Sequence, residues 1–367
     1  MAEPIGQNKE TGVPSRHDRF VGCLLGGAVG DALGAPIEFD SWSQIQGWFG
    51  DRGLQDYAPA YGRRGAITDD TQMTLFTAEG LIRARSRSAG SGTADIDAVM
   101  HRAYERWLLT QVGDPGTVPW DPDFGPRSNT GWLVTEPFLQ QRRAPGNTCL
   151  GALLNGYRIG TPASPINQSK GCGGVMRVAP VGLVAGADSF DLGCRVAALT
   201  HGHPSGWMAA GALAAIVEGV TRGVNLDVAA QTAAERCSGV AGGYEVAEAL
   251  DEAVALSQTC RRPSADDVES LGAGWVAEEA LAISVYCALT AADFRDGVLN
   301  AVNHSGDSDS TGSIAGNLLG TWLGLQAIDD ELLEPLEGRP VIEEIADDLY
   351  DAFVGGREPD SERYPPW

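Results

Sequence analysis

The sequence lacks paired cysteines. Its seven cysteines, an odd number, are scattered along the chain, and no two of them form a CxxC motif. Most lie in apolar stretches, where a free cysteine behaves as a small hydrophobic residue. We therefore expect a reducing compartment, no disulfide bond and no zinc site. Cys172 has no adjacent His or Asn to activate it, so we expect it to be structural rather than nucleophilic.

Long apolar runs are also missing. No segment approaches the roughly 18 consecutive apolar residues that a membrane-spanning helix needs. The first 17 residues are polar and contain no hydrophobic region of the kind found in secretory signal peptides. We expect a cytoplasmic protein that does not contact membranes, in which residues 1–17 form a flexible N-terminal segment.

Basic residues are few. The chain has 26 Lys and Arg against 49 Asp and Glu, a net charge of −23 at pH 7, and residues 329–362 alone contain 13 acidic and 2 basic residues. A surface this acidic repels nucleic-acid backbones and anionic lipid head groups. We expect no bulk nucleic-acid binding, although a local site can still hold a nucleotide. We also expect a monomer.

No segment shows the period-two alternation that half-buried strands need. Helical periodicity dominates instead, as where Val21, Leu24 and Leu25 share one face. Other helices are predicted at residues 75–82, 96–109, 192–199, 208–217, 226–234, 246–257, 277–289, 314–325 and 341–353. We predict an all-α fold, a compact single-domain orthogonal helical bundle of about a dozen helices. It spans residues 18–354 and is followed by a loosely held C-terminal tail, residues 355–367.

The helical signal disappears between residues 110 and 144. This stretch contains five prolines and the tryptophans Trp120 and Trp132. A loop of this length inside a compact domain is usually functional, and it can cover a ligand. The alternative is a surface connection packed by its own tryptophans, and both remain open. Residues 261–272 indicate a simple linker between helices.

Two short acidic clusters lie far apart in the sequence, Thr68-Asp69-Asp70-Thr71 and Gly306-Asp307-Ser308-Asp309-Ser310-Thr311. Each stands at the start of a predicted helix. Carboxylates on a tight turn, with hydroxyls beside them, are the hard oxygen ligands that Mg²⁺, Mn²⁺ and Ca²⁺ prefer. The ordinary alternative is that both clusters are helix N-caps. If the fold brings them together, they can form a binuclear metal centre.

A third acidic motif, Gly30-Asp31-Ala32-Leu33-Gly34 followed by Glu38, precedes both clusters. The three motifs in this order resemble those of the ADP-ribosylglycohydrolase family, the relatives of dinitrogenase reductase-activating glycohydrolase. Two middle blocks are also similar to the family's, Gly171-Cys172-Gly173-Gly174-Val175-Met176-Arg177 and Thr200-His201-Gly202-His203-Pro204. Each motif alone is weak, but the ordered set is specific and covers nearly the whole chain.

The resemblance implies a centre of two Mg²⁺ ions, for which Mn²⁺ can substitute. The ligands that it implies are Thr68, Asp69, Asp70, Asp307, Asp309 and Ser310. It implies that Glu38 acts near the scissile bond, as an acid/base or as a gate, and we also count Asp70 and Asp309 as catalytic. We expect Asp31 to hydrogen-bond the turn before Gly34, and His304 to support the ligands without binding metal.

Residues 169–180 begin with glycines and continue into an apolar helix. Backbone N–H groups at such a helix start can bind a diphosphate without a charged side chain, although the pattern is often only a tight turn. We expect substrate contacts from Gly171, Gly173, Gly174, Met176 and His201. Lys170 can add a cation near the phosphates. We do not expect His201 and His203 to bind metal, because a hard-oxygen site is already present and no third soft ligand is near.

The function implied by the resemblance is hydrolysis of the glycosidic bond between ADP-ribose and a modified acceptor. Such a reaction passes through an oxocarbenium-like state, and metal ions can hold the ribose and orient water. An ordinary two-carboxylate glycosidase that uses Glu38 is a competing arrangement. The alternatives are a non-catalytic ADP-ribose-binding or crystallin-like structural relative and a two-metal phosphohydrolase. The sequence leaves the acceptor open, whether Arg, Ser, a nucleic-acid base or a small molecule.

Overall fold

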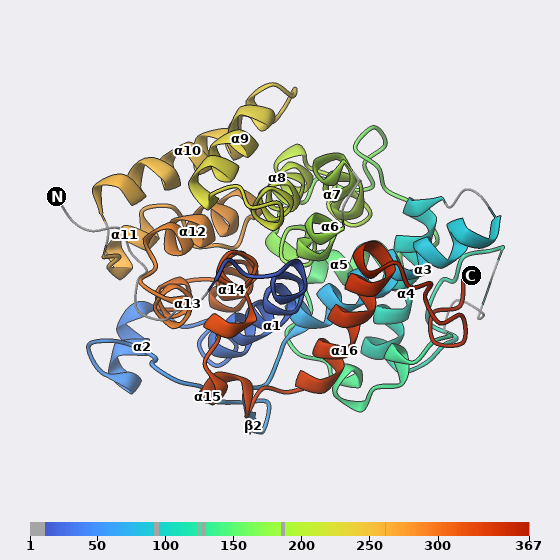
Figure 1. Ribbon diagram of the computed structural model, residues 1–367, viewed down its shortest axis with the longest axis horizontal. Helices are drawn as coiled ribbons and strands as arrows, with labels where there is room; N and C mark the ends of the chain where they lie inside the picture. The colour runs from blue at the N-terminus through green and yellow to red at the C-terminus, as the bar shows by residue number, and fades with distance from the viewer. Residues whose placement is uncertain are drawn as a thin grey trace.

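Helices are the main secondary structure of the described chain. The computed structural model describes residues 12–91, 95–123, 125, 130–184, 188–260 and 262–366. Within these ranges there are sixteen α-helices (Figure 1). They are α1 Arg16–Gly34, α2 Trp42–Phe49, α3 Asp69–Ser91, α4 Ile96–Val112, α5 Asn147–Leu154, α6 Ala179–Leu183, α7 Ser189–Ala198, α8 Pro204–Thr221, α9 Leu226–Ser238, α10 Tyr244–Thr259, α11 Ala265–Glu269, α12 Ala277–Thr290, α13 Phe294–Val302, α14 Ser308–Leu323, α15 Asp330–Leu333 and α16 Arg339–Tyr350.

Strand content is negligible in the described residues. A hairpin pairs β1 (Pro59–Ala60) with β2 (Arg63–Arg64) in antiparallel register. Shorter 3₁₀ turns occur at Leu133–Thr135, Pro137–Gln140, Cys172–Gly174 and Leu325–Ala327, and a π-helical turn follows α16 at Asp351–Gly355. The prediction of an all-α single domain is confirmed. There are more helices than expected because α6, α11 and α15 have only four or five residues, too few to show a period.

The centre of the bundle is an antiparallel pair, α1 and α14, which lie side by side in Figure 1. Glycines every four residues let the two backbones touch. A Cβ on Gly26 would lie 2.4 Å from the carbonyl oxygen of Gly316, and one on Gly22 would lie 2.5 Å from that of Gly320. This register sets the C-terminal end of α1 against the N-terminal end of α14. The acidic motif at residues 30–38 therefore meets the cluster at residues 306–311.

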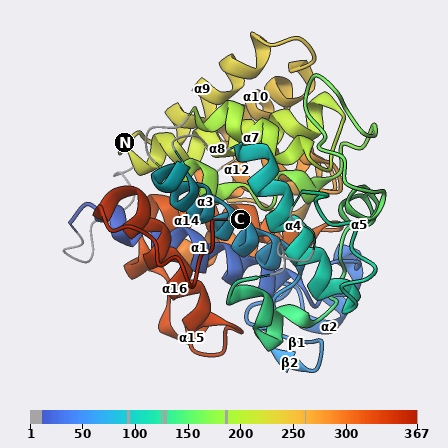
Figure 2. The ribbon, with the colours of Figure 1, turned by 90° about the vertical axis from the view of Figure 1, so that its right-hand side faces the viewer.

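The other helices surround this pair. Figures 1 and 2 show α7 to α10 with α12 on one side of it, α3 with α4 on another, and α16 across α1. Helix α8 is apolar on nearly all faces, and most of its residues, from Ser205 to Thr221, are buried. No helix in the described parts of the chain combines the length and the apolar character needed to cross a bilayer.

The chain termini differ from the sequence-based expectation. Residues 1–11 lie outside the described residues, but Arg16 and His17 belong to α1, and His17 Nε2 lies 2.8 Å from Asp347 Oδ1. Most of residues 355–362 in the predicted C-terminal tail are exposed, but the segment packs against the protein at Tyr364 and Pro365. Tyr364 is 1% exposed and its hydroxyl donates to Asp348 Oδ2 over 2.6 Å. The buried Tyr364 side chain thus holds in place a segment whose sequence shows no helical periodicity.

Two predicted connections also contain structure. Residues 261–272 include α11, so they are more than a simple linker. In the 110–144 stretch, Trp120 Nε1 donates to Pro115 O over 2.8 Å, and the Trp132 ring lies 3.9 Å below the guanidinium carbon of Arg363. Both tryptophans are half-buried against the protein, which agrees with the second alternative, and a role of this stretch in covering a ligand stays a prediction. Residues 124 and 126–129 of this stretch are outside the described residues.

Candidate functional site

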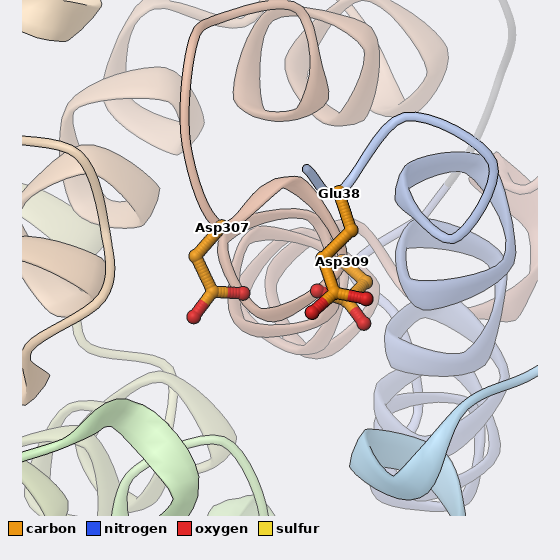
Figure 3. Close-up of side chains that lie close together, drawn as sticks. All are labelled: Glu38, Asp307 and Asp309. Carbon is orange, nitrogen blue, oxygen red and sulfur yellow. The ribbon is translucent and has the colours of Figure 1, made fainter. Parts of the chain in front are cut away.

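The two acidic clusters and the turn after α1 converge on one buried site. Carboxylate oxygens of Glu38, Asp307 and Asp309 all lie within 4.8 Å of one another. Figure 3 shows the carboxylate of Glu38 close to that of Asp309, with Asp307 nearby. Glu38 lies on the turn after α1, and Asp309 lies in the first turn of α14. The six predicted ligands are each at most 4% exposed, and Glu38 is 7% exposed: Thr68, Asp69, Asp70, Asp307, Asp309 and Ser310.

Asp31 holds the start of α3 in place. Its carboxylate accepts hydrogen bonds from Thr68 N at 3.0 Å, Thr71 N at 3.1 Å and Thr71 Oγ1 at 2.5 Å. We expected Asp31 to bond the turn before Gly34, and this is wrong. Asp31 instead caps a helix 37 residues further along the chain, because it is completely buried beside the unpaired N–H groups of α3.

Ordinary capping also orients the second cluster. Asp307 is the N-cap of α14, and its Oδ1 accepts from Ser310 N at 3.3 Å. Asp309 Oδ1 accepts from the same N–H at 2.9 Å. Asp69 Oδ2 accepts from Gly146 N at 3.2 Å. The capping and metal-binding interpretations are therefore compatible, since each capping carboxylate has a second oxygen to offer.

The cluster has far more negative charge than the protein around it can neutralise. None of its carboxylates forms an ion pair with a Lys or Arg of the described residues. Asp70 Oδ1 and Glu38 Oε2 are buried and have no hydrogen-bond partner there. Burial first, and then the charge of Asp309, raises the pKa of Glu38 to about 11 and the pKa of Asp69 well above its usual value.

The donor set fits a divalent cation. Several carboxylates in one buried site repel one another strongly unless protons or cations compensate them. The oxygens of Thr68 and Ser310 add uncharged hard ligands, and Thr68 Oγ1 lies 3.5 Å from Asp70 Oδ2. Oxygen-only sites of this kind suit Mg²⁺ and Mn²⁺.

Comparison with known proteins agrees with this geometry. The profile of the family described as ADP-ribosylglycohydrolase matches residues 13–359. This chain belongs to the ADP-ribosylglycohydrolase family. The resemblance carried by the sequence motifs is thereby confirmed.

Relatives are distant but cover most of the chain. An ADP-ribosyl-[dinitrogen reductase] glycohydrolase of Rhodospirillum rubrum is 26% identical over 329 residues, which are 88% of this chain and 92% of that protein. An uncharacterized protein of Archaeoglobus fulgidus is 29% identical over 349 residues, 92% of this chain and 98% of that one. A solved structure described as an ADP-ribosylglycohydrolase-related protein complex is 24% identical, with a TM-score of 0.63, over 93% of this chain and 99% of that one, and it shares the fold.

The glycine-rich segment of this family member lies against the acidic cluster. Ser310 Oγ donates to Met176 Sδ over 3.8 Å, and Met176 is 2% exposed. Gly171 forms a bridge with Val276, which ties the segment to the loop before α12. Gly173 and Gly174 are buried in the 3₁₀ turn. Their predicted role in binding a diphosphate stays a prediction.

His201 lies beneath this segment rather than at a surface. It is 1% exposed, and its Nδ1 lies 2.9 Å from Thr200 Oγ1. A Cβ on Gly173 would lie 3.2 Å from His201 Cε1, so the imidazole packs against the turn. Burial, and then the charge of Arg177, lowers the pKa of His201 to about 3, which keeps the ring neutral at physiological pH.

Three other polar residues near the site have clear partners. Lys170 forms ion pairs with Glu278 of α12 and with Glu245 of α10, the latter at 3.0 Å, so its charge is neutralised by protein. Lys170 is therefore not a free cation, which argues against the expectation that it adds a positive charge near the phosphates. His304 Nε2 lies 3.0 Å from Thr311 Oγ1, where it supports the first turn of α14. His203 caps α8 by accepting from Ser205 N.

Several residues around the cluster were not predicted from the sequence to lie there. Phe39 is 73% exposed and stacks on Trp275 with ring centroids 5.7 Å apart, next to the turn that holds Glu38. Tyr61 at the hairpin has a φ of 50°, which is unusual for a residue with a side chain. Cys172 was expected to be structural, but its Sγ donates to Asp307 Oδ2 over 2.8 Å. In the sequence, the only sign that Cys172 lies near the site is its position in the glycine-rich segment.

Proposed function

We propose that this chain is a Mg²⁺-dependent ADP-ribosyl hydrolase that cleaves the glycosidic bond between ADP-ribose and a modified acceptor. The observation that carries the proposal is the buried cluster of Glu38, Asp307 and Asp309 beside Asp69 and Asp70, without a Lys or Arg partner among the described residues. The printed activity of the Rhodospirillum relative, which is a glycohydrolase of an ADP-ribosyl group, supports it.

The residues that would hold cations are Thr68, Asp69, Asp70, Asp307, Asp309 and Ser310. When bound, Mg²⁺ would supply Lewis-acid polarisation of hydroxyl groups and water. Asp309 has the central position, because its charge raises the pKa values of Asp31, Glu38 and Asp69. Losing this one carboxylate should therefore disturb the site more than losing any other.

Glu38 is the candidate acid/base. It lies on a short turn rather than in a helix, and its Oε2 has no partner within the described chain. It can therefore hold a proton at Oε2 or take one from water, as general acid–base catalysis requires. Phe39 and Trp275 beside it are exposed aromatic surfaces on which an acceptor can pack.

A purely structural role explains the cluster poorly. Buried carboxylates that repel one another destabilise a fold, so a protein without a ligand here gains nothing from them. A two-metal phosphohydrolase uses similar ligands and is the stronger rival. The monomeric state and the ADP-ribosylated partner remain part of the proposal.

Product analysis tests the proposal. Purified protein is stripped with a chelator, resupplied with Mg²⁺, and incubated with ADP-ribose linked to Arg, to Ser, to a nucleobase and to acetate. Release of intact ADP-ribose with a free acceptor supports glycosidic hydrolysis. AMP release, or turnover of a simple phosphate ester, would instead show a phosphohydrolase. No turnover of any substrate, together with ADP-ribose binding, would show a non-catalytic relative.

A further inference from the structure

Cys172 lies at the edge of the acidic cluster. Its Sγ donates a hydrogen bond to Asp307 Oδ2 over 2.8 Å. Burial first, and then the charges of Asp307 and of Asp70, raise the pKa of the thiol well above its usual value. The Ser310 side chain is close enough to lower the pKa of the thiol slightly. The sulfur therefore sits among three of the side chains that we assign to the metal centre.

The backbone holds the sulfur and the carboxylate together. Cys172 N donates to Trp275 O over 3.2 Å, and Asp307 N donates to Ala273 O over 2.9 Å, so one short loop supports both residues. Gly306 makes this approach possible. Its φ is 144°, and a Cβ there would lie 2.0 Å from Ala273 O. The contact between thiol and carboxylate is thus built into the fold.

A second observation also points to a ligand in this space. Asp70 Oδ1 and Glu38 Oε2 have no hydrogen-bond partner in the described chain, although Asp70 is only 2% exposed and Glu38 only 7%. Buried carboxylate oxygens without a partner need a cation or a proton. A cation that binds beside Asp307 and Asp70 can therefore take one sulfur and several oxygens as ligands.

We propose that Cys172 is a metal ligand, which makes the Asp307 side of the centre a mixed sulfur and oxygen site for a borderline or soft divalent cation such as Zn²⁺ or Cd²⁺. Such ions favour thiolate ligands, whereas Mg²⁺ favours oxygen alone. As the metal–sulfur bond forms, the S–H bond breaks and the proton goes to solvent, with no change of oxidation state. Zn²⁺ then competes with Mg²⁺ for Asp307. This inference rests on the metal centre of the proposed function.

Co²⁺ is the probe for the test, because thiolate-bound Co²⁺ gives a near-ultraviolet charge-transfer band that oxygen-bound Co²⁺ lacks. Chelator-treated wild type, Cys172→Ser and Cys260→Ser are titrated with Co²⁺ by absorption and by calorimetry. Serine keeps a hydroxyl that can donate to Asp307. Cys260 is the matched control, since its Sγ donates to Asp267 Oδ2 over 3.4 Å and it is also partly buried.

We expect the band in wild type and in Cys260→Ser. In Cys172→Ser we expect calorimetric Co²⁺ binding without the band. Co²⁺ binding to wild type without a band, or a band that survives Cys172→Ser, overturns the inference and leaves the oxygen-ligand centre intact. If calorimetry detects no Co²⁺ or Mg²⁺ binding to wild type, the metal centre of the proposed function fails as well.

Competition supplies a second measurement. The ratio of Zn²⁺ to Mn²⁺ affinity should fall about 10- to 100-fold in Cys172→Ser, the usual effect of altering an immediate metal environment. Mn²⁺ affinity itself should change little, because the oxygen ligands remain. An unchanged ratio contradicts ligation by Cys172.

Discussion

Gly30 of α1 and Gly312 of α14 are in backbone contact, and a Cβ added to Gly30 would lie 1.9 Å from the carbonyl oxygen of Gly312. Gly30 directly precedes Asp31, and Gly312 lies one helical turn after Asp309, so this contact fixes the distance between the two halves of the acidic site. The oxygen belongs to a helix backbone, which cannot rotate away as a side chain can. Glycine is therefore required at position 30 for packing.

We expect Gly30→Ala to lower the free energy of unfolding by about 3 kcal/mol or more, because an added methyl group in a filled contact forces the helices apart. Gly47→Ala is the control. Gly47 is in α2 with nothing within 4 Å of the added Cβ, and alanine there should stabilise the helix by about 0.5–1 kcal/mol. Urea denaturation measures both. Equal effects of the two substitutions would refute the packing argument.

Sequence patterns predicted the helices well because their signals are local. The period of Val21, Leu24 and Leu25 and the acidic starts of α3 and α14 both appear in a window of a few residues. The acidic clusters could be paired only through family resemblance. Their contact depends on the register of α1 against α14, which glycines set across nearly 300 residues of sequence.

Other features depend on tertiary contacts that no local pattern encodes. Asp31 caps α3 rather than its own turn, and Tyr364 anchors a segment without periodicity. The charge of Lys170 is paired with Glu245 and Glu278, which lie 75 and 108 residues further along the sequence. In each case the residue type was visible, but its partner was determined by the fold.

Replacing Asp309 should separate stability from metal binding. Asp309→Asn removes the charge that raises the pKa of neighbouring carboxylates, so the metal-free protein should become more stable. Stabilisation by Mg²⁺ should shrink, because a bound ion stabilises only through its affinity for the folded state. Thermal unfolding with and without Mg²⁺ measures both effects.

The control for Asp309→Asn is Asp251→Asn on the exposed surface of α10, which makes the same change of charge outside the cluster. It should leave the Mg²⁺-dependent rise in Tm at the wild-type value. If Asp309→Asn also keeps the full rise, Asp309 is not a ligand.

The buried imidazole of His201 should make the fold sensitive to acid. Burial lowers its pKa from 6.5 to about 3, so the folded state favours the neutral ring. The stability that this provides is complete above pH 6.5 and is lost as the pH falls from 6.5 toward 3. At pH 4.5 the loss relative to pH 8 is about 3 kcal/mol for this one group.

His201→Asn should therefore show a smaller fall in unfolding free energy between pH 8 and pH 4.5 than wild type, although its stability at pH 8 will be lower. His203→Asn controls for the loss of an imidazole two residues away, with Asn kept as a good cap for α8. Parallel pH profiles for wild type and His201→Asn would show that another group causes the acid sensitivity.

Glu38 is the residue on which the catalytic proposal depends most directly. Glu38→Gln keeps the size of the side chain and its place on the turn after α1, but Oε2 can no longer exchange a proton. If Glu38 is the acid/base, kcat should fall by about 10²–10⁴, the usual contribution of such catalysis. ADP-ribose affinity, measured by calorimetry, should change little because the aspartates are untouched. Asp40→Asn, on the same turn but more exposed, should retain wild-type kcat. Near-wild-type turnover of Glu38→Gln would remove Glu38 from the mechanism and leave the aspartates to activate water.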